Sequence, residues 1–176
     1  MTIYTFIALT VAVFFASCPP GTDAAQNVEA NDITFLQKAA QEQLAEIALG
    51  KLAMKKGSDK KVKELGAEIA EDHHYASQEI KDVSAQEGIY LPVDMDDQQK
   101  KAQQQLSHLS GNKFDKAFIA YIVKQHRKQA EALQKHSSKL HNENMKQWAQ
   151  TTEPIVAVHL KKAENVAEAL QMGEAK

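Results

Sequence analysis

Four stretches of this chain carry apolar residues at spacings of three and four, the period of an α-helix with one buried face. They cover residues 32–56, 58–88, 112–139 and 142–172. The low count of seven Gly and four Pro, among many Ala, Gln, Glu, Lys and Leu residues, also favours helices. No strand pattern competes with this period, and the sequence therefore predicts an all-α protein.

The breaks between these stretches predict how the helices begin, end and connect. Asn31 and Asp32 are both able to cap the first helix, which ends at Gly57. The tight Gly57-Ser58 join makes the first two helices an antiparallel hairpin. Within the last helix, Pro154 predicts a kink or a break.

Residues 89–111 predict a crossover between two helical hairpins. They are polar, with a thin apolar face from Leu106 and Leu109, and can be helical from about Met95 to Leu109. About twenty residues of mixed loop and helix can travel roughly 30 Å, the length of a bundle. Two hairpins joined in this way predict a four-helix bundle with one crossover, the ferritin-like arrangement.

The N-terminus predicts export. Residues 3–16 form a long uncharged apolar run at the extreme N-terminus, too short to span a bilayer comfortably. Cys18 follows it in the sequence Phe15-Ala16-Ser17-Cys18, which resembles a bacterial lipoprotein signal except for Phe15. In this interpretation Cys18 is lipidated, and the lipid anchors the protein to the outer membrane. The alternative is ordinary signal-peptide cleavage, with Ala25 as the last residue removed. Residues 1–25 are accordingly read as signal and linker, and 26–176 as the bundle domain.

Charge and cysteine content narrow the possible partners. Lys and Arg total 21 against 23 Asp and Glu, and they are interleaved along the chain, so nucleic acid is not an expected partner. Cys18 is the sole cysteine, so the mature domain has no internal disulfide and no thiolate metal site. We expect an envelope or periplasmic protein whose membrane contact is through the lipid, and whose protein partner the sequence does not identify.

Polar residues interrupt the apolar stripe on every long helix. They are Glu46 on the first helix, Asp72 and His73 on the second, His126 on the third and His159 on the fourth. At about 1.5 Å rise per residue, Glu46 and His73 lie roughly twelve and fifteen residues from the Gly57-Ser58 join, an offset near 5 Å that the lean of the side chains reduces. The sequence therefore predicts that imidazoles and carboxylates meet at one depth of the core.

Three imidazoles with one or two carboxylates suit Zn²⁺, Cu²⁺ or Fe²⁺. A ferritin-type dimetal centre needs a Glu-x-x-His pair on each of two helices, and the sequence does not supply them. His74 of Glu71-x-x-His74 is rotated off the buried row, and the residue three positions before His159 is Val156 instead of Glu. The alternative is a set of neutral core histidines that donate hydrogen bonds to Asp72, Glu46 or Tyr121, without a metal.

Four separated blocks resemble a known family in order and spacing. They read FLQKAAQEQLAEIALGKLA, VKELGAEIAEDHH, LSGNKFDKAFIAYIVKQH and EPIVAVHLKKA. The likeness is to the exported, ferritin-like bacterial domain-of-unknown-function family 4142, whose members are often labelled outer-membrane proteins. The resemblance implies an envelope-associated bundle and no particular activity. Its shared pattern falls on these positions of the chain: Glu46, Asp72, His73, Asp115, His126 and His159.

Three functions follow from these observations. The first is an envelope protein that binds a transition metal through Glu46, His73, His126 and His159, with Asp72 as a fifth ligand or as an acceptor behind a ligand. The second is a non-catalytic structural or stress-associated bundle whose buried polar layer fixes helix register. A redox enzyme is a third candidate, suggested by fold analogy alone.

Overall fold

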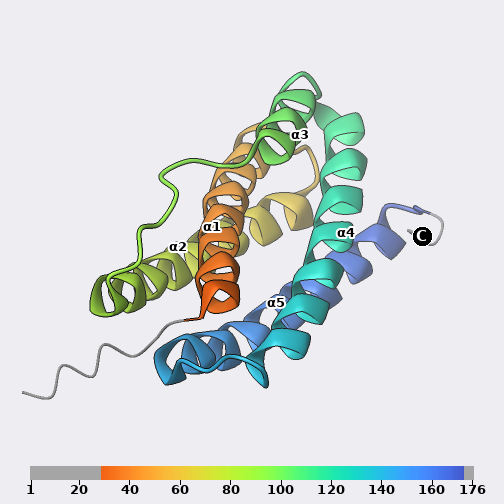
Figure 1. The fold of residues 1–176 in the computed structure, drawn as a ribbon. Helices are drawn as coiled ribbons and strands as arrows, with labels where there is room; N and C mark the ends of the chain where they lie inside the picture. The colour runs from red at the N-terminus through yellow and green to blue at the C-terminus, as the bar shows by residue number, and fades with distance from the viewer. Residues whose placement is uncertain (1–28, 173–176) are drawn as a thin grey trace, which may run out of the picture.

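The structure, a computed structural model, describes residues 29–172. Across this range it has five α-helices and no strands (Figure 1). Their bounds are α1 Ala30–Lys56, α2 Lys60–Glu87, α3 Asp97–Ser107, α4 Gly111–Ser137 and α5 Glu143–Ala169. The predicted all-α bundle is confirmed, with α1–α2 and α4–α5 as antiparallel hairpins and α3 inside the crossover. Cys18 and the apolar run at 3–16 lie outside the described residues.

The two hairpins pack through α2 and α5, while α1 and α4 lie on the near side of the bundle in Figure 1 and touch at few positions. The short helix α3 packs against both α1 and α4. Between residues 29 and 172 no helix is both long enough and apolar enough to cross a lipid bilayer.

Helices α1 and α2 approach closely because glycines face each other across the hairpin. A Cβ atom on Gly50 would lie 2.4 Å from the carbonyl oxygen of Gly66, and one on Gly66 would lie 2.5 Å from the Cβ of Ala53. Both distances are shorter than van der Waals contact allows. The hairpin therefore requires glycine at these positions, and it leaves no space between α1 and α2 at this level.

The α1–α2 turn is held by a side chain from α4. The buried carboxylate of Asp115 accepts hydrogen bonds from the backbone nitrogens of Ser58 (3.0 Å) and Asp59 (2.9 Å), and a further one from the Ser58 hydroxyl. Asp59 itself caps α2 by accepting from Lys61 and Val62. Asp115 thus has a structural role in fixing where the first hairpin meets the second.

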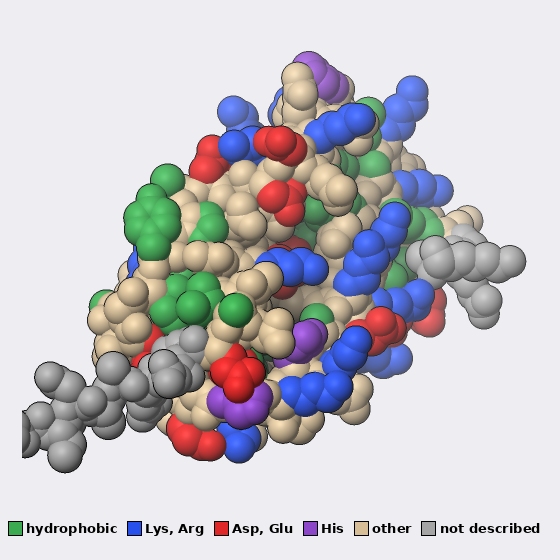
Figure 2. Space-filling view, in the orientation of Figure 1, with side chains coloured by type: hydrophobic (Ala, Val, Ile, Leu, Met, Phe, Trp, Pro, Cys, Tyr) green, Lys and Arg blue, Asp and Glu red, His purple; other side chains and the backbone are tan. Residues whose placement is uncertain are grey.

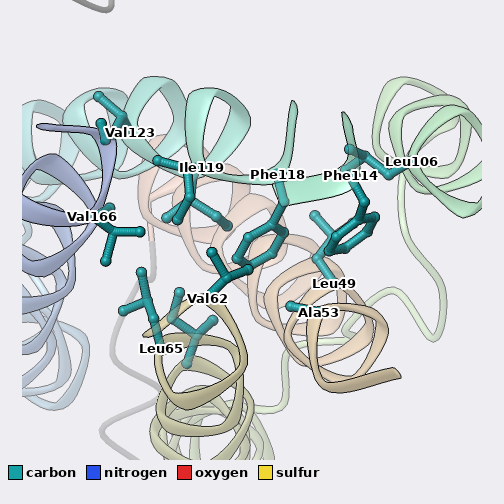
Figure 3. Packing of buried hydrophobic residues seen from close by; sticks show 14 residues of the cluster. Leu49, Ala53, Val62, Leu65, Leu106, Phe114, Phe118, Ile119, Val123 and Val166 are labelled. Carbon is teal, nitrogen blue, oxygen red and sulfur yellow. The ribbon is translucent and has the colours of Figure 1, made fainter. Parts of the chain in front are cut away.

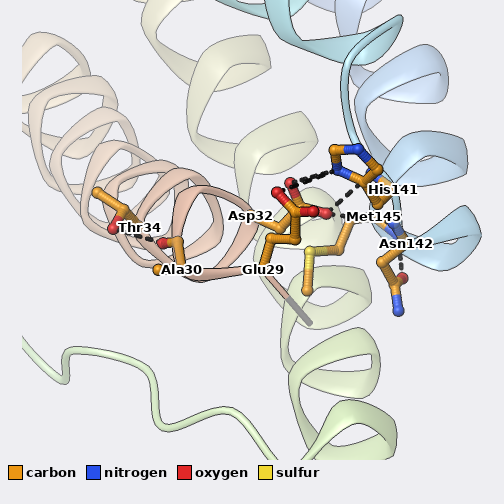
Figure 4. Close-up of polar contacts among 7 residues, drawn as sticks. All are labelled: Glu29, Ala30, Asp32, Thr34, His141, Asn142 and Met145. Atoms are coloured by element: carbon orange, nitrogen blue, oxygen red, sulfur yellow. Dashed lines mark hydrogen bonds and ion pairs between the residues drawn. The ribbon is translucent and has the colours of Figure 1, made fainter. Parts of the chain in front are cut away.

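The predicted capping role of Asp32 is wrong. In residues 29–172 the Asp32 side chain does not cap α1. It is buried and accepts hydrogen bonds from the backbone nitrogens of His141 (2.9 Å) and Asn142 (3.2 Å) in the α4–α5 turn (Figure 4). Asn142 caps α5 by accepting from Met145. A carboxylate from one hairpin therefore holds the turn of the other at each end of the bundle.

Two other local expectations need correction. The break considered at Pro154 is wrong, since α5 runs continuously through it. Pro154 is exposed, so water can satisfy the carbonyl that loses its helical partner. Met54 falls on the apolar stripe of residues 32–56, which predicts burial, but its side chain is 50% exposed.

The apolar core has two parts, one towards each end of the bundle. The first contains the stacked rings of Phe114 and Phe118, which pack with residues of α1, α2 and α5 (Figure 3). The second surrounds Leu36, Met145 and Trp148 at the opposite end. On every long helix, a buried polar side chain lies between the residues of the first cluster and those of the second: Glu46, His73, His126 and His159.

Candidate metal centre

Three histidines occupy the layer between the two apolar clusters. His73 follows Ile69 on α2, His126 follows Val123 on α4, and His159 precedes Ala163 on α5. Their exposed fractions are 1%, 0% and 0%. Because the helical period continues through each of them, the same register that buries the flanking apolar residues turns these rings inward.

The three imidazole rings lie next to one another. Their centroids lie 5.6 Å apart for His73 and His126, 5.5 Å for His73 and His159, and 5.5 Å for His126 and His159. One nitrogen from each ring lies within 4.8 Å of the other two. The structure therefore brings together residues from three helices that are 33 or more positions apart in sequence.

Two hydrogen bonds fix which nitrogens carry hydrogen. Nδ1 of His73 lies 2.7 Å from Oε1 of Gln43, and Nε2 of His159 lies 3.0 Å from Oδ2 of Asp72. An amide oxygen and a carboxylate oxygen accept, so the nitrogen facing each donates. A neutral ring then keeps a lone pair on its other nitrogen, which is Nε2 of His73 and Nδ1 of His159. We call these two atoms the lone-pair nitrogens.

Neither lone-pair nitrogen has a hydrogen-bond partner among residues 29–172, and neither does either nitrogen of His126. Buried polar atoms without a partner cost roughly 1–3 kcal/mol each. Each of these three neighbouring imidazoles thus keeps at least one buried ring nitrogen without a partner. This is the donor set that a metal ion would satisfy.

The rings are neutral, as metal ligands must be. Burial, together with the other two rings, lowers the pKa of His73 well below its usual value. Burial and His159 lower the pKa of His126 to about 3, an effect that the backbone carbonyl of Ile122 partly offsets. Burial also lowers the pKa of His159, an effect that Asp72 partly offsets.

Glu46 lies beside the three histidines rather than among them. Its Oε1 is 3.9 Å from Nδ1 of His126, too long for a hydrogen bond, and its Oε2 has no partner in the described part of the chain. Glu46 is 5% exposed. Burial, reinforced by Glu42 one turn earlier, raises its pKa to about 8. A nearby cation would favour the ionised form and draw this carboxylate towards the histidines.

The remaining residues singled out from the sequence are placed as follows. Asp72 accepts from Nε2 of His159 and its side chain is 39% exposed, so it orients the ring of His159 from the edge of the buried layer. His74 is exposed, as its rotation off the buried row predicted. Asp115, which belongs to the shared family pattern, holds the α1–α2 turn and lies in the first apolar region.

Gln43 is the residue that the sequence reasoning missed. It is fully buried and accepts from His73. A signal was present, because Gln43 follows Leu36, Ala39 and Ala40 at helical spacing on the buried row of α1. A glutamine there marks a position where a polar group is needed inside the core.

The donor set fits a transition metal ion. Zn²⁺ binds imidazole nitrogens at about 2.0–2.1 Å, which places neighbouring ligand atoms of a tetrahedral site about 3.3 Å apart. The ligand nitrogens here lie within 4.8 Å of one another. An inward shift of order 1 Å would therefore be needed for these three nitrogens to hold one ion, and Glu46 would be the nearby oxygen donor.

The sequence matches the profile of the family described as "Domain of unknown function (DUF4142)" over residues 17–166, and the chain belongs to that family. No curated protein matches it closely enough to count as a relative. In the solved structures, the crystal structure of a DUF305 fragment from Deinococcus radiodurans is similar, with a TM-score of 0.71 and 11% identity over 81% of this chain and 98% of that one. This likeness shows a common helical-bundle fold.

Proposed function

We propose that this protein binds one transition metal ion in the layer between its two apolar clusters, with His73, His126 and His159 as nitrogen ligands and Glu46 as the oxygen ligand. Asp72 and Gln43 act behind the ligands, because each accepts the hydrogen of a ring whose other nitrogen faces the centre. Acceptors of this kind orient the imidazoles and raise their basicity. Zn²⁺, Cu²⁺ and Fe²⁺ all suit such a donor set.

The observation that supports this proposal most is the pair of lone-pair nitrogens. A set of histidines that served only to fill the core would be expected to satisfy both ring nitrogens, or to leave the unsatisfied ones apart. Here Gln43 and Asp72 satisfy one nitrogen of His73 and one of His159, and each of the three rings, which lie together, keeps a nitrogen without a partner among residues 29–172. Lone pairs on neighbouring ring nitrogens repel one another, and a cation bound between the rings would remove this repulsion.

The competing function is a structural bundle whose polar layer sets helix register without a metal. It is favoured by the same two hydrogen bonds, because they tie α2 to α1 and to α5. In that case His126, whose ring nitrogens find no partner in residues 29–172, would contribute nothing beyond its packing volume. The two functions therefore differ in what they require of His126.

Metal titration separates them. The purified protein is stripped with a chelator, titrated with Zn²⁺, Cu²⁺ or Fe²⁺ (the last without oxygen), and followed by calorimetry and thermal melting. We expect one ion per chain and a melting temperature that rises with metal concentration, since binding to the folded state alone stabilises it. The His73→Ala, His126→Ala double variant should lose both responses. Unchanged melting and no binding with all three metals would refute the proposal.

A matched control guards against adventitious binding by surface histidines. His108 is exposed in the turn after α3, outside the buried layer. The His108→Ala variant should bind metal as the unaltered protein does. Equal loss of binding in His108→Ala and in the double variant would assign the bound metal to the surface.

The proposed location is the cell envelope. It is supported by the apolar run at 3–16 and by Cys18 directly after it. Mass spectrometry of the native N-terminus tests this proposal: lipid on Cys18 indicates an anchored protein, cleavage after Ala25 a periplasmic one. A native protein that begins at Met1 would contradict export.

A further inference from the structure

The three histidines are sealed inside the bundle, so an ion needs a path to reach them. We propose that a divalent transition metal ion enters through the cavity between α1 and α4, and that Glu42 and Glu46 form a carboxylate entry site which the ion occupies on its way to the histidines. This inference rests on the proposed function and extends it to the route of loading.

The cavity lies where the two hairpins meet least. It has a volume of about 350 Å³, and its walls come from α1, α3 and α4 with Asp96 at the α3 cap. The residues that matter here are Glu42, Glu46, Tyr121, Gln125 and Gln129. Because α1 and α4 touch at few positions, this side of the histidine layer is less tightly packed than the α1–α2 and α4–α5 sides.

Glu46 connects the cavity to the metal centre. It lines the cavity, yet its Oε1 is 3.9 Å from Nδ1 of His126. Its other oxygen, Oε2, is buried and finds no partner within the described chain. A nearly buried carboxylate with an unsatisfied oxygen on a cavity wall is a group that a cation would bind.

Glu42 extends this path towards the solvent. It lies one helical turn before Glu46 on α1, about 6 Å along the axis, and on the same face. Glu42 also lines a second cavity of about 570 Å³ at the α1 N-terminal end, so it stands where the two cavities meet. An ion that passes from Glu42 to Glu46 to His126 keeps an oxygen or nitrogen ligand at each step.

The α2–α5 side is less suitable as a route. There His159 presents its N–H to Asp72, so an incoming ion would meet a proton instead of a lone pair. Next to it, Glu68 forms an ion pair with Lys162, which bridges the two helices. The side between α1 and α2 is occupied at this level by the hydrogen bond between Gln43 and His73.

Lysines also line the cavity, at positions 38, 124 and 128. Figure 2 shows Lys and Arg side chains in a band along the α4 side of this face, with Asp and Glu side chains nearby. These cations repel a metal ion, and Lys38 lies on the same face of α1 as Glu42, one turn before it. Removing Lys38 should therefore accelerate entry, and removing Glu42 should slow it.

The test is the kinetics of Co²⁺ binding, followed by stopped-flow absorbance in the metal-free protein, with dissociation measured by chelator capture. A residue on the path is not a ligand of the bound ion, so Glu42→Gln should lower the association and dissociation rate constants together, each about tenfold, with a much smaller change in Kd. Lys38→Gln should raise both. The control Glu131→Gln makes the same charge change on an exposed position of α4 outside the cavity, and should alter neither.

The outcomes separate this inference from the function beneath it. Co²⁺ binding at unaltered rates in Glu42→Gln would overturn the entry route and leave the metal centre standing. A weaker Kd with an unchanged association rate would also overturn it, because Glu42 would then be a ligand and not a passage. Failure of the unaltered protein to bind Co²⁺, Zn²⁺, Cu²⁺ or Fe²⁺ would remove the function itself.

Discussion

Nε2 of His159 donates a hydrogen bond of 3.0 Å to the carboxylate of Asp72, and this contact leaves Nδ1 of the same ring free to face His73 and His126. Asp72 thus selects the tautomer of a proposed metal ligand from a half-exposed position on α2. A residue outside the buried layer thus determines which ring nitrogen of His159 carries the hydrogen.

Replacing this carboxylate should weaken metal binding without unfolding the protein. In Asp72→Ala the ring of His159 loses its fixed tautomer, and the loss of such an acceptor lowers metal affinity by about 10- to 100-fold. Stability in the metal-free state should change little, because Asp72 is partly exposed. A competition titration with a chromophoric chelator measures the affinity. The matched control is Asp82→Ala on the exposed surface of α2, and an equal effect of both changes would contradict this role.

His126→Leu should separate stability from function. Neither ring nitrogen of His126 has a hydrogen-bond partner in the described residues, so an apolar side chain of similar size removes two unsatisfied groups from the core. We expect the metal-free variant to be as stable as the unaltered protein or more stable by about 1 kcal/mol, and to bind no metal. Urea unfolding together with metal titration checks both statements. Metal binding retained in His126→Leu would contradict the role of His126 as a ligand, and clear destabilisation of the metal-free variant would contradict the absence of stabilising hydrogen bonds to its ring.

Glu46 should make the metal-free protein less stable as the pH rises. Its pKa is about 8 in the folded state against 4.5 ordinarily, so between these values the folded state keeps a proton that the unfolded chain loses. This effect is fully favourable below about pH 4.5 and disappears towards pH 8, at up to about 1.4 kcal/mol per pH unit. Unfolding measured against pH should show this loss, and Glu46→Gln should reduce it.

His126 should make the protein less stable as the pH falls, the opposite of the effect of Glu46. Its pKa is about 3 in the folded state against 6.5 ordinarily, so the unfolded chain takes up a proton that the folded state refuses. Stability should therefore fall as the pH drops below about 6.5, and His126→Leu should weaken this acid limb. An acid limb of unchanged steepness in His126→Leu would show that other groups cause it.

Asp115 should matter for folding and not for metal. Its carboxylate accepts from Ser58 and Asp59 at the α1–α2 turn. Asp115→Ala removes the partner of these partly buried donors and should cost about 1–2 kcal/mol in unfolding free energy. Metal affinity measured under conditions where the variant is folded should be unchanged. A large loss of affinity would place Asp115 in the metal centre after all.

The fold was largely predictable, because the helical period of apolar residues is a local signal and short turns leave little choice of topology. The same period placed His73, His126 and His159 on the buried faces. The helical period did not predict which residue forms a hydrogen bond with each imidazole. Gln43 reaches His73 across the α1–α2 hairpin, and such a contact depends on how two helices are rotated against each other.

Asp32 illustrates the same limit. Its position at the start of a helix fits a cap, yet it binds the α4–α5 turn 109 residues away (Figure 4). Sequence spacing also could not set the height of one hairpin against the other, since the crossover leaves that offset free. The side chains of Asp32 and Asp115, which tie opposite ends of the hairpins together, fix it in the structure.

X-ray absorption spectroscopy of the Zn²⁺-loaded protein tests the metal centre most directly. The account predicts one zinc per chain with three imidazole nitrogens and one carboxylate oxygen at about 2.0–2.1 Å, and a loss of imidazole scattering in His126→Leu. A zinc ion surrounded by oxygen ligands alone, or a spectrum that His126→Leu leaves unchanged, would contradict it.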